Sequence, residues 1–202
     1  MRWARRGAGG LRLGLAAVGV HGATAQVRRL TPDPPMDRWQ PAYIGVGSNL
    51  EDPRAQVLTA ITRLGQLRRT RLVLASSLYR SRPFGPVAQP DFVNAVAGIL
   101  TQLEPPALLK ELKAIESSMG RPEPHEHWGP RIIDLDLIAH GSERCDEVEL
   151  TLPHPGIVER NFVLYPLADI APDLDVPGLG RVSELRRRVA PEGLQRLSAT
   201  SA

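Results

Sequence analysis

The 202-residue sequence is poor in cysteine, aromatic residues and lysine, and each scarcity excludes a class of protein or site. Cys145 is the only cysteine, so the chain forms no intrachain disulfide and offers no cysteine cluster for zinc. Aromatic residues make up 4% of the chain, which argues against a sheet that stacks RNA bases. No lysine precedes Lys110, so the glycine-rich run at residues 45 to 49 is not a Walker loop. No apolar run reaches the roughly 18 to 20 residues that span a membrane.

Positive charge is concentrated at the start of the chain. Residues 1 to 39 contain seven Arg and two Asp, a net charge of +5, whereas the remaining 163 residues contain 18 basic and 20 acidic groups, a net charge of −2. The formal charge of +3 therefore describes the N-terminal segment and not a basic binding face. We expect neither a nucleic-acid partner nor a membrane partner.

Residues 1 to 39 form an N-terminal extension with three possible interpretations. Arginines within residues 1 to 6 precede an apolar stretch at residues 11 to 20, as in a secretory signal, and the lack of acidic residues before Asp33 also suits an organellar targeting peptide. Alternatively, translation starts at Met36, just before the first predicted strand. We favour a disordered or misassigned extension over either targeting segment, and therefore a cytoplasmic protein.

Hydrophobic periodicity predicts one α+β domain over residues 40 to 190, followed by a flexible tail at residues 191 to 202. Short connections and only two long helices favour a ferredoxin-like antiparallel sheet in the order βαββαβ, with helices packed on one face. Two proline-rich segments, residues 81 to 90 and 121 to 130, cannot be regular structure. Strands are predicted at residues 42–46, 72–78, 92–103 and 148–152, and another holds the Asp-Leu-Asp run at residues 134–136. Long helices are predicted to start at residues 53 and 105, and short ones at residues 157–167 and 182–189.

The most informative segment is WGPRIIDLDLIAHG at residues 128 to 141. Asp134 and Asp136 lie two residues apart in an apolar strand, so their side chains share one face and the neighbouring apolar side chains share the other. Two carboxylates in a half-buried setting repel each other and lose hydration, which a divalent cation relieves. Spacing alone leaves open a solvated edge strand that carries two aspartates.

Cationic side chains flank this pair in the sequence. Arg121, Arg131 and Arg160 lie before and after it, together with His154. Guanidinium groups and a carboxylate pair that holds a metal are the two ingredients of phosphoryl transfer. Taken singly, each arginine could equally be a solvated surface group.

A second set of side chains could bind a flat heterocycle. Phe92, Trp128 and Phe162 could stack on its faces, and Asn94 could form paired hydrogen bonds with its edge. The structural alternative places the phenylalanines in the core and makes Asn94 a capping or strand-edge amide.

Five segments in order make the chain resemble the 6-hydroxymethyl-7,8-dihydropterin pyrophosphokinase family of folate biosynthesis across residues 42 to 175. The resemblance implies a diphosphotransferase that moves pyrophosphate from MgATP to the hydroxymethyl group of a reduced pterin, giving AMP and the pterin diphosphate. The segments are YIGVGSNL at 43–50, SRPFGPVAQPDFVNA at 81–95, Glu116 with Gly120 and Arg121, WGPRIIDLDLI at 128–138, and LPHPGIVERNFVLYPLADIAP at 152–172.

The resemblance also implies residue roles and a monomer that acts on two small molecules, ATP and the pterin. Asp134 and Asp136 would hold two magnesium ions, and Arg121 and Arg131 would be catalytic. The implied ATP-binding residues are Glu116, Arg121, Arg131, Leu137, Thr151, His154 and Arg160. The implied pterin-binding residues are Gly47, Ser81, Pro83, Phe84, Phe92, Asn94, Trp128, Asp134 and Phe162.

Several positions depart from the family's pattern. Glu123 and His127 stand where basic residues are frequent, and Pro155 replaces a common tyrosine. These changes predict intact catalysis with weaker ATP binding. Two other functions compete with this interpretation: a non-catalytic ferredoxin-like module that binds RNA or a protein partner, and a metal-dependent phosphotransferase that acts on another heterocycle.

Overall fold

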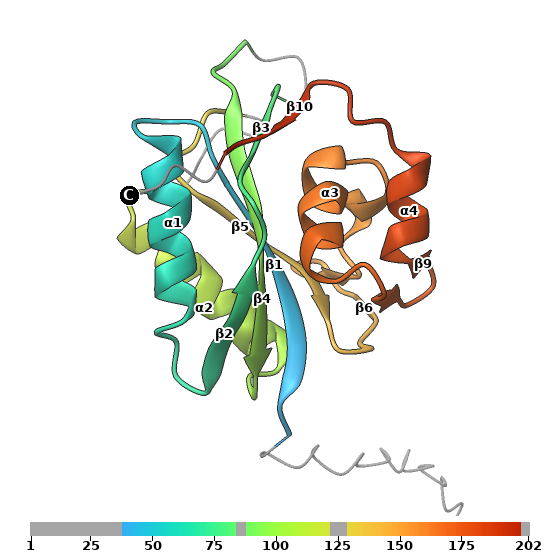
Figure 1. The fold of residues 1–202 in the computed structure, drawn as a ribbon. Coiled ribbons are helices and arrows are strands. Elements are labelled where there is room, and N and C mark those ends of the chain that lie inside the picture. Colours follow the sequence, from blue (N-terminus) through green and yellow to red (C-terminus); the bar gives the residue numbers. More distant parts are fainter. Residues whose placement is uncertain (1–37, 84–87, 122–128, 199–202) are drawn as a thin grey trace, which may run out of the picture. The chain divides into compact units, whose positions relative to one another are not determined.

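The computed structural model describes residues 38–83, 88–121 and 129–198. Its centre is a six-stranded antiparallel sheet with the order β10-β3-β4-β1-β5, in which β2 also pairs with β4 (Figure 1). Because β4 is the longest strand, it pairs with β1 along one edge and with β2 and β3 in turn along the other. The strands are β1 (Gln40–Ser48), β2 (Thr70–Ala75), β3 (Tyr79–Ser81), β4 (Phe92–Thr101), β5 (Asp134–His140) and β10 (Leu194–Arg196).

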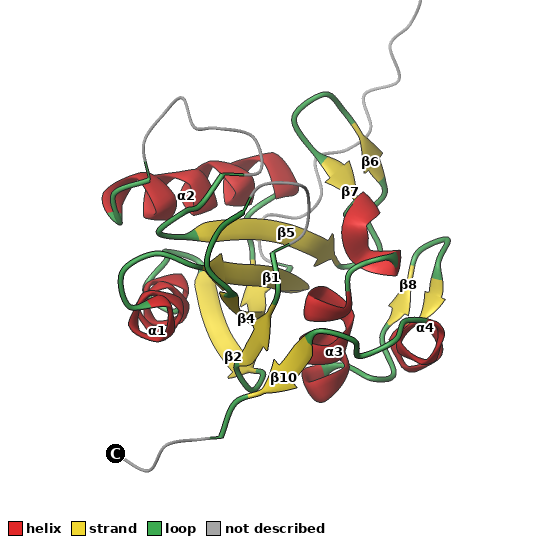
Figure 2. Ribbon diagram, turned by 90° about the horizontal axis from the view of Figure 1, so that it is seen from above, coloured by secondary structure: helices red, strands yellow, loops and turns green. Residues whose placement is uncertain are grey.

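Helices cover both faces of this sheet, as Figures 1 and 2 show. Helices α1 (Pro53–Leu64) and α2 (Pro105–Ser118) pack on one face. Helix α3 (Asn161–Ile170) packs on the other, and α4 (Val182–Arg188) packs against α3. The remaining elements are the 3₁₀-helix η1 (Pro155–Val158) and two small hairpins, formed by β6 (Cys145–Asp146) with β7 (Thr151–Leu152) and by β8 (Asp175–Val176) with β9 (Gly180–Arg181).

The antiparallel α+β sheet is confirmed, but the prediction that helices cover only one face is wrong. Strand β4 is buried from residue 93 to residue 99, so both of its faces need cover. Ile44 and Leu112 belong to the core beneath α1 and α2, whereas Val96 and Leu164 belong to a second core beneath α3. The short helices after β5 therefore form a third layer.

Local sequence signals place the long helices correctly. Asp52 caps α1 by accepting a hydrogen bond from the backbone N of Ala55 at 3.1 Å, and Pro53 occupies the first turn. Gly120, with φ of +92°, follows α2 in the left-handed conformation that glycine adopts most readily. None of the helices within the described ranges combines the length and the hydrophobicity needed to cross a bilayer.

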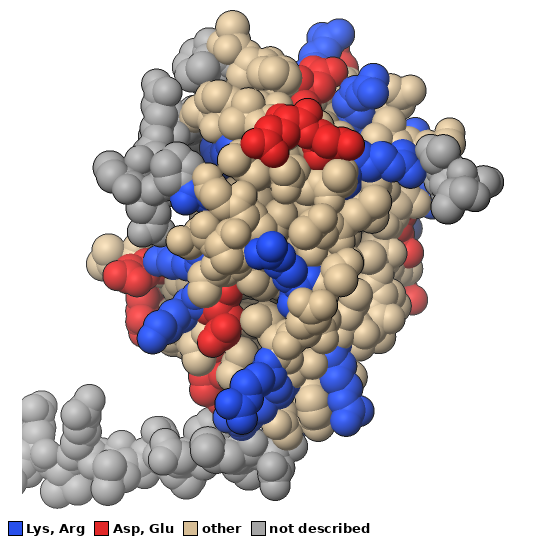
Figure 3. Space-filling view, turned by 90° about the vertical axis from the view of Figure 1, so that its left-hand side faces the viewer, with Lys and Arg blue, Asp and Glu red and all other residues tan. Residues whose placement is uncertain are grey.

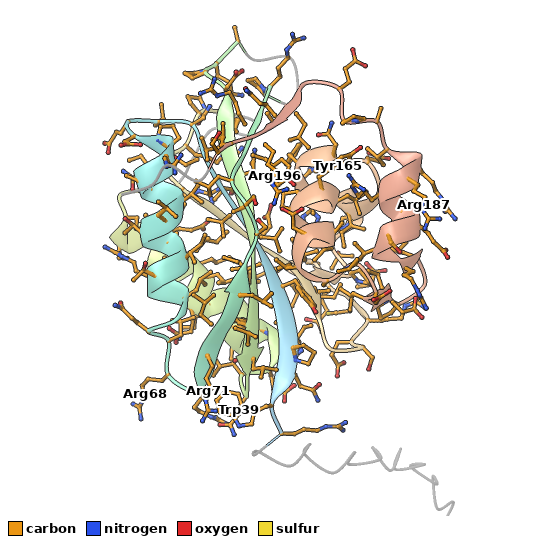
Figure 4. All side chains as sticks on the ribbon, in the orientation of Figure 1. Trp39, Arg68, Arg71, Tyr165, Arg187 and Arg196 are labelled. Carbon is orange, nitrogen blue, oxygen red and sulfur yellow. The ribbon has the colours of Figure 1, made fainter. Side chains whose placement is uncertain are left out.

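The predicted flexible tail contains an ordered strand. Strand β10 pairs with β3, so that Leu194 lies opposite Ser81, and the backbone N of Arg82 donates to the carbonyl oxygen of Gly193 at 3.3 Å. Arg196, which Figure 4 labels between the sheet and α3, donates to the hydroxyl of Ser77 at 2.7 and 3.0 Å. This segment was expected to be flexible because three residues are too few to show a strand period.

Two other predicted strands also differ from the structure. Of the predicted strand at 72–78 only residues 72 to 75 are in a strand, β2, and residues 76 to 78 form the connection to β3. The predicted strand at 148–152 retains only β7 at its end. On the face covered by α1, acidic and basic side chains are interspersed (Figure 3).

Candidate active site

One cavity of about 310 Å³ gathers most of the candidate residues. It lies where β1 ends and β5 begins, on the sheet face opposite α1 and α2. Among the described residues thirteen line it, of which eleven are predicted site residues and the other two are Arg82 and Gln89. The eleven are Gly47, Ser81, Phe92, Asn94, Arg121, Arg131, Asp134, Asp136, His154, Arg160 and Phe162.

Strand register brings the two halves of the cavity together. Gly47 of β1 pairs with Asn94 of β4 on one side and with Asp134 of β5 on the other. A Cβ atom at Gly47 would lie 3.1 Å from Oδ1 of Asn94 and 3.9 Å from the ring of Phe92. The missing side chain therefore keeps open the space between the carboxylates and the aromatic residues.

The two aspartates lie on the cavity side of β5, as their spacing predicts. Leu135 and Leu137 point into the core on the opposite side. Asp134 accepts hydrogen bonds through Oδ1 from Arg121 at 2.7 Å and through Oδ2 from Arg131 at 2.8 Å. Burial raises the pKa of Asp136 to about 6, and repulsion by the Asp134 carboxylate adds to the shift.

Glu116 lies beside this pair near the end of α2. Its Oε1 accepts a hydrogen bond from the backbone N of Leu135 at 2.7 Å and another from Arg121. Burial raises the pKa of Glu116 to about 7, although Arg121 offsets part of the effect. Arg121 is thus held between the carboxylates of Glu116 and Asp134 and does not depend on one contact for its position.

His154 and Arg160 supply further polar groups on the side of η1. Nδ1 of His154 accepts a hydrogen bond from the backbone N of Gly156 at 3.0 Å. Burial lowers the pKa of His154, and the nearby Arg160 lowers it further, so the neutral imidazole is favoured. With Nδ1 acting as acceptor, the neutral ring carries its proton on Nε2 and can donate it to an oxygen atom.

Aromatic and amide groups line the other half of the cavity. Phe92 comes from β4 and Phe162 from the first turn of α3. Asn94, whose exposed fraction is 6%, donates through Nδ2 to the hydroxyl of Ser81 at 2.9 Å. A fixed amide beside two rings suits a flat, polar-edged heterocycle.

Some predicted residues are not brought to this cavity. Leu137 is 3% exposed and packs in the core, because the alternation of β5 turns it away from Asp136. Thr151 lines a separate cavity beside Cys145. Glu116 and Pro83 are described but do not line the main cavity, and the remaining predicted residues, Phe84 and Trp128, lie outside the described residues, as do Glu123 and His127.

Sequence reasoning missed Asn49, Arg82 and Gln89. Arg82 and Gln89 line the cavity from the proline-rich segment that follows β3. Asn49 bonds to Gln89 on one side and to the backbone of Arg131 on the other. Only its place at the end of a buried strand marked Asn49 in the sequence, and that signal does not distinguish a turn residue from a functional one.

The donor set fits magnesium. Within the described ranges, no three His, Cys, Asp or Glu side chains are arranged to hold a metal, so a cation here would rest on two carboxylates. Mg²⁺ commonly uses one or two carboxylates and completes its shell with water and phosphate oxygens. Buried Asp136, with its raised pKa, is a group that a cation would stabilise in its charged form. The cavity thus combines a carboxylate pair and cationic side chains with a fixed amide and two aromatic rings, as in the active site of an enzyme that acts on small molecules.

Comparison with known proteins gives the family. The model of the 7,8-dihydro-6-hydroxymethylpterin-pyrophosphokinase family matches residues 43–172, and the chain belongs to this family. It is 46% identical over 158 residues to the 2-amino-4-hydroxy-6-hydroxymethyldihydropteridine pyrophosphokinase of Pseudomonas aeruginosa, covering 78% of this chain and 97% of the relative. The Haemophilus influenzae protein of the same name is 43% identical, with 78% and 98% covered.

A solved structure supports the fold. The Plasmodium falciparum HPPK-DHPS crystal structure with pterin and p-hydroxybenzoate superposes with a TM-score of 0.61 at 14% identity. The match covers 79% of this chain and 47% of that one, so the chain spans about half the length of this relative. At this identity the likeness concerns the fold alone.

Proposed function

We propose that the chain transfers pyrophosphate from MgATP to the hydroxymethyl group of 6-hydroxymethyl-7,8-dihydropterin, giving AMP and the pterin diphosphate, in folate biosynthesis. The observation that carries this proposal is the junction of two subsites in one cavity. Asp134 with its arginines lies on one side of Gly47, and Asn94 with Phe92 lies on the other. The names of the relatives in the same family supply the identity of the substrate.

Asp134 and Asp136 would hold magnesium, two ions by the family resemblance. When bound, the metal would neutralise charge on the phosphate oxygens. Both oxygens of Asp134 accept hydrogen bonds from guanidinium groups. A cation that takes either oxygen therefore competes with Arg121 or Arg131 and frees that arginine for a phosphate group.

Arg121 and Arg131 each have a second hydrogen-bond partner that keeps the side chain in position if it releases Asp134. Arg121 keeps Glu116 as a partner when Asp134 is engaged elsewhere. Nε of Arg131 donates to the carbonyl oxygen of Gly129 at 3.3 Å, which leaves its Nη1 available for exchange. Fixed guanidinium groups close to the transferring phosphates stabilise charge as it develops in the transition state.

The proposed reaction forms one bond and breaks one. The hydroxymethyl oxygen bonds to the β-phosphorus and gives up its proton to solvent, while the bond from that phosphorus to the oxygen bridging the α-phosphate breaks and AMP leaves with that oxygen. Phe92 and Phe162 would hold the pterin rings, Asn94 would bond to their edge, and His154 and Arg160 would bind phosphate oxygens. Positioning of the two substrates supplies much of the catalysis in such transfers.

AMP formation tests this function. The folded native chain is incubated with MgATP alone, with the hydroxymethyl dihydropterin, and with the 6-methyl dihydropterin, which lacks the accepting hydroxyl group. We expect AMP only with the hydroxymethyl compound, and a loss of at least about 100-fold in Asp134→Ala, the effect of removing several kcal/mol of transition-state stabilisation. No pterin-dependent AMP from the folded native chain would defeat the proposal, and AMP with another heterocycle alone would favour the competing phosphotransferase.

We also propose a cytoplasmic monomer whose partners are these small molecules. ATP as co-substrate supports the compartment. Sedimentation of the active enzyme at assay concentration measures the oligomeric state, and activity confined to a dimer would contradict this part.

A further inference from the structure

Asn49 joins two segments that lie on opposite sides of the cavity. It follows β1 directly and is 2% exposed. Its Oδ1 accepts a hydrogen bond from the backbone N of Arg131 at 2.8 Å, and its own backbone N donates to the carbonyl oxygen of Arg131 at 3.1 Å. Its Nδ2 donates to Oε1 of Gln89 at 2.9 Å and to the carbonyl oxygen of Pro90 at 3.1 Å.

Two of these partners fix the orientation of the amide. The backbone N–H of Arg131 can only donate, so it requires the Oδ1 of Asn49, and the carbonyl of Pro90 can only accept, so it requires Nδ2. A flipped amide would face both partners with the wrong group. Asparagine is therefore the residue that matches both segments at once, and its burial withholds water as a substitute.

We propose that Asn49 is a positioning residue that couples the heterocycle side of the cavity to Arg131. This inference rests on the proposed function. Gln89 lines the cavity on the side of Phe92, and Arg131 lines it beside Asp134. Because one amide bonds to both segments, a shift of Gln89 and Pro90 is transmitted to the backbone of Arg131 and so to its guanidinium group.

The coupling predicts a particular kinetic signature. Asn49 acts on the reaction through the position of Arg131, so its loss should lower the rate of the chemical step more than it raises KM for ATP. Gln89 bonds to Nδ2 of Asn49 and lines the cavity on the heterocycle side. Its loss should raise KM for the pterin and affect the chemical step less.

A double-mutant cycle tests the proposal. Single-turnover AMP formation with enzyme in excess is measured for the native chain, Asn49→Ala, Arg131→Ala and the double variant. We expect Asn49→Ala to slow the native chain by about 10- to 100-fold, the effect of losing two or three buried hydrogen bonds. In the Arg131→Ala background the same change should slow the reaction by less than about threefold, since residues that act together are not additive.

Thr70→Val provides a matched control. Oγ1 of Thr70 shares a buried hydrogen bond of 2.8 Å with Thr101, at the end of β4 away from Asn94. This variant should lower the melting temperature and leave the AMP rate within about twofold, because it removes the hydrogen bonds of Oγ1 to Thr101 and to the carbonyl oxygen of Arg68 without touching the cavity. Melting temperatures are measured for every variant, and if Asn49→Ala does not fold, Asn49→Ser enters the same cycle.

The outcomes separate the two proposals. Equal slowing by the Asn49 change in both backgrounds would show independent effects and overturn the positioning role. If Thr70→Val lowers the single-turnover rate of AMP formation as much as Asn49→Ala does, the effect comes from general destabilisation, and the positioning role is overturned as well. A folded native chain without pterin-dependent AMP would instead overturn the proposed function.

Discussion

Replacing Gly47 with alanine should impair pterin binding without weakening the fold. The residue lies in β1 between Asn94 and Asp134, and its φ angle is outside the left-handed region, so alanine can adopt its backbone conformation. The added methyl group would lie 3.1 Å from Oδ1 of Asn94. This contact is tighter than most Cβ contacts, so the amide of Asn94 must shift by a few tenths of an ångström from the position in which it would bond to the pterin.

The expected size follows from the hydrogen bonds at risk. Asn94 is held by its 2.9 Å bond to Ser81 and is only 6% exposed, so it has little room to yield. Losing one or two hydrogen bonds between this amide and the pterin costs about 1 kcal/mol each. KM for the pterin should therefore rise about 5- to 30-fold. The free energy of unfolding should stay within about 1 kcal/mol of the native value, because the strain of the close contact with Asn94 opposes the gain from restricting the unfolded chain.

Gly45→Ala is the matched control on the same strand. Its Cβ would make ordinary contacts, 3.4 Å from Ile138 and 3.7 Å from the Cβ of Asp136. Steady-state KM values for the pterin and for ATP, with melting temperatures, are compared for both variants. An unchanged pterin KM in Gly47→Ala, or equal increases in both variants, would refute the placement of the heterocycle beside Gly47.

Three further predictions concern pH, the C-terminal strand and the core. The apparent affinity for Mg²⁺ should fall as pH drops through about 6, because burial raises the pKa of Asp136 to about 6 and protons then compete with the metal for this carboxylate. The check is a magnesium titration of AMP formation at pH 5.5 and at pH 7.5, and equal apparent affinities at the two pH values would contradict the prediction. Ending the chain at residue 190 removes β10, which pairs with Ser81 in β3, and should therefore raise KM for the pterin more than KM for ATP. Equal increases in the two KM values would contradict an effect confined to the pterin side of the cavity. Burial and the Asp169 carboxylate raise the pKa of Tyr79 to about 12, above its ordinary 10, so the folded state retains the proton longer than the unfolded state. Stability from this proton is complete below pH 10 and lost as pH rises towards 12; urea unfolding at pH 9 and 11 should show this extra loss in the native chain and not in Tyr79→Phe.

Local signals in the sequence predict much of the sheet. Asp52 followed by Pro53 marks the start of α1, and the apolar run of β4 predicts a buried strand. The end of β2 at residue 75, three residues before the predicted strand ends, is not visible locally. The hydroxyl of Ser76 accepts a hydrogen bond from the backbone N of Val96 at 2.9 Å, which satisfies β4 where the strand pairing is interrupted. The side-chain hydroxyl takes the place of a strand carbonyl here, and this replacement depends on a partner 20 residues away in the sequence.

The candidate site shows the same division between local pattern and distant contact. A strand period of two places Asp134 and Asp136 on one face, and the structure has them there. The same period turns the side chain of Leu137 away from the cavity, which the family resemblance alone did not indicate. The sequence does not predict the role of Asn49, because that role depends on hydrogen bonds to Gln89, 40 positions away, and to Arg131, 82 positions away.

Transfer of pyrophosphate, as opposed to one phosphate, is the central claim, and a labelled substrate tests it most directly. ATP carrying a radioactive β-phosphorus is incubated with the native chain, Mg²⁺ and the hydroxymethyl dihydropterin, and the products are separated. We expect the label in the pterin diphosphate and unlabelled AMP in equal amount. Label retained in ADP, with a pterin monophosphate as the other product, would contradict the assignment.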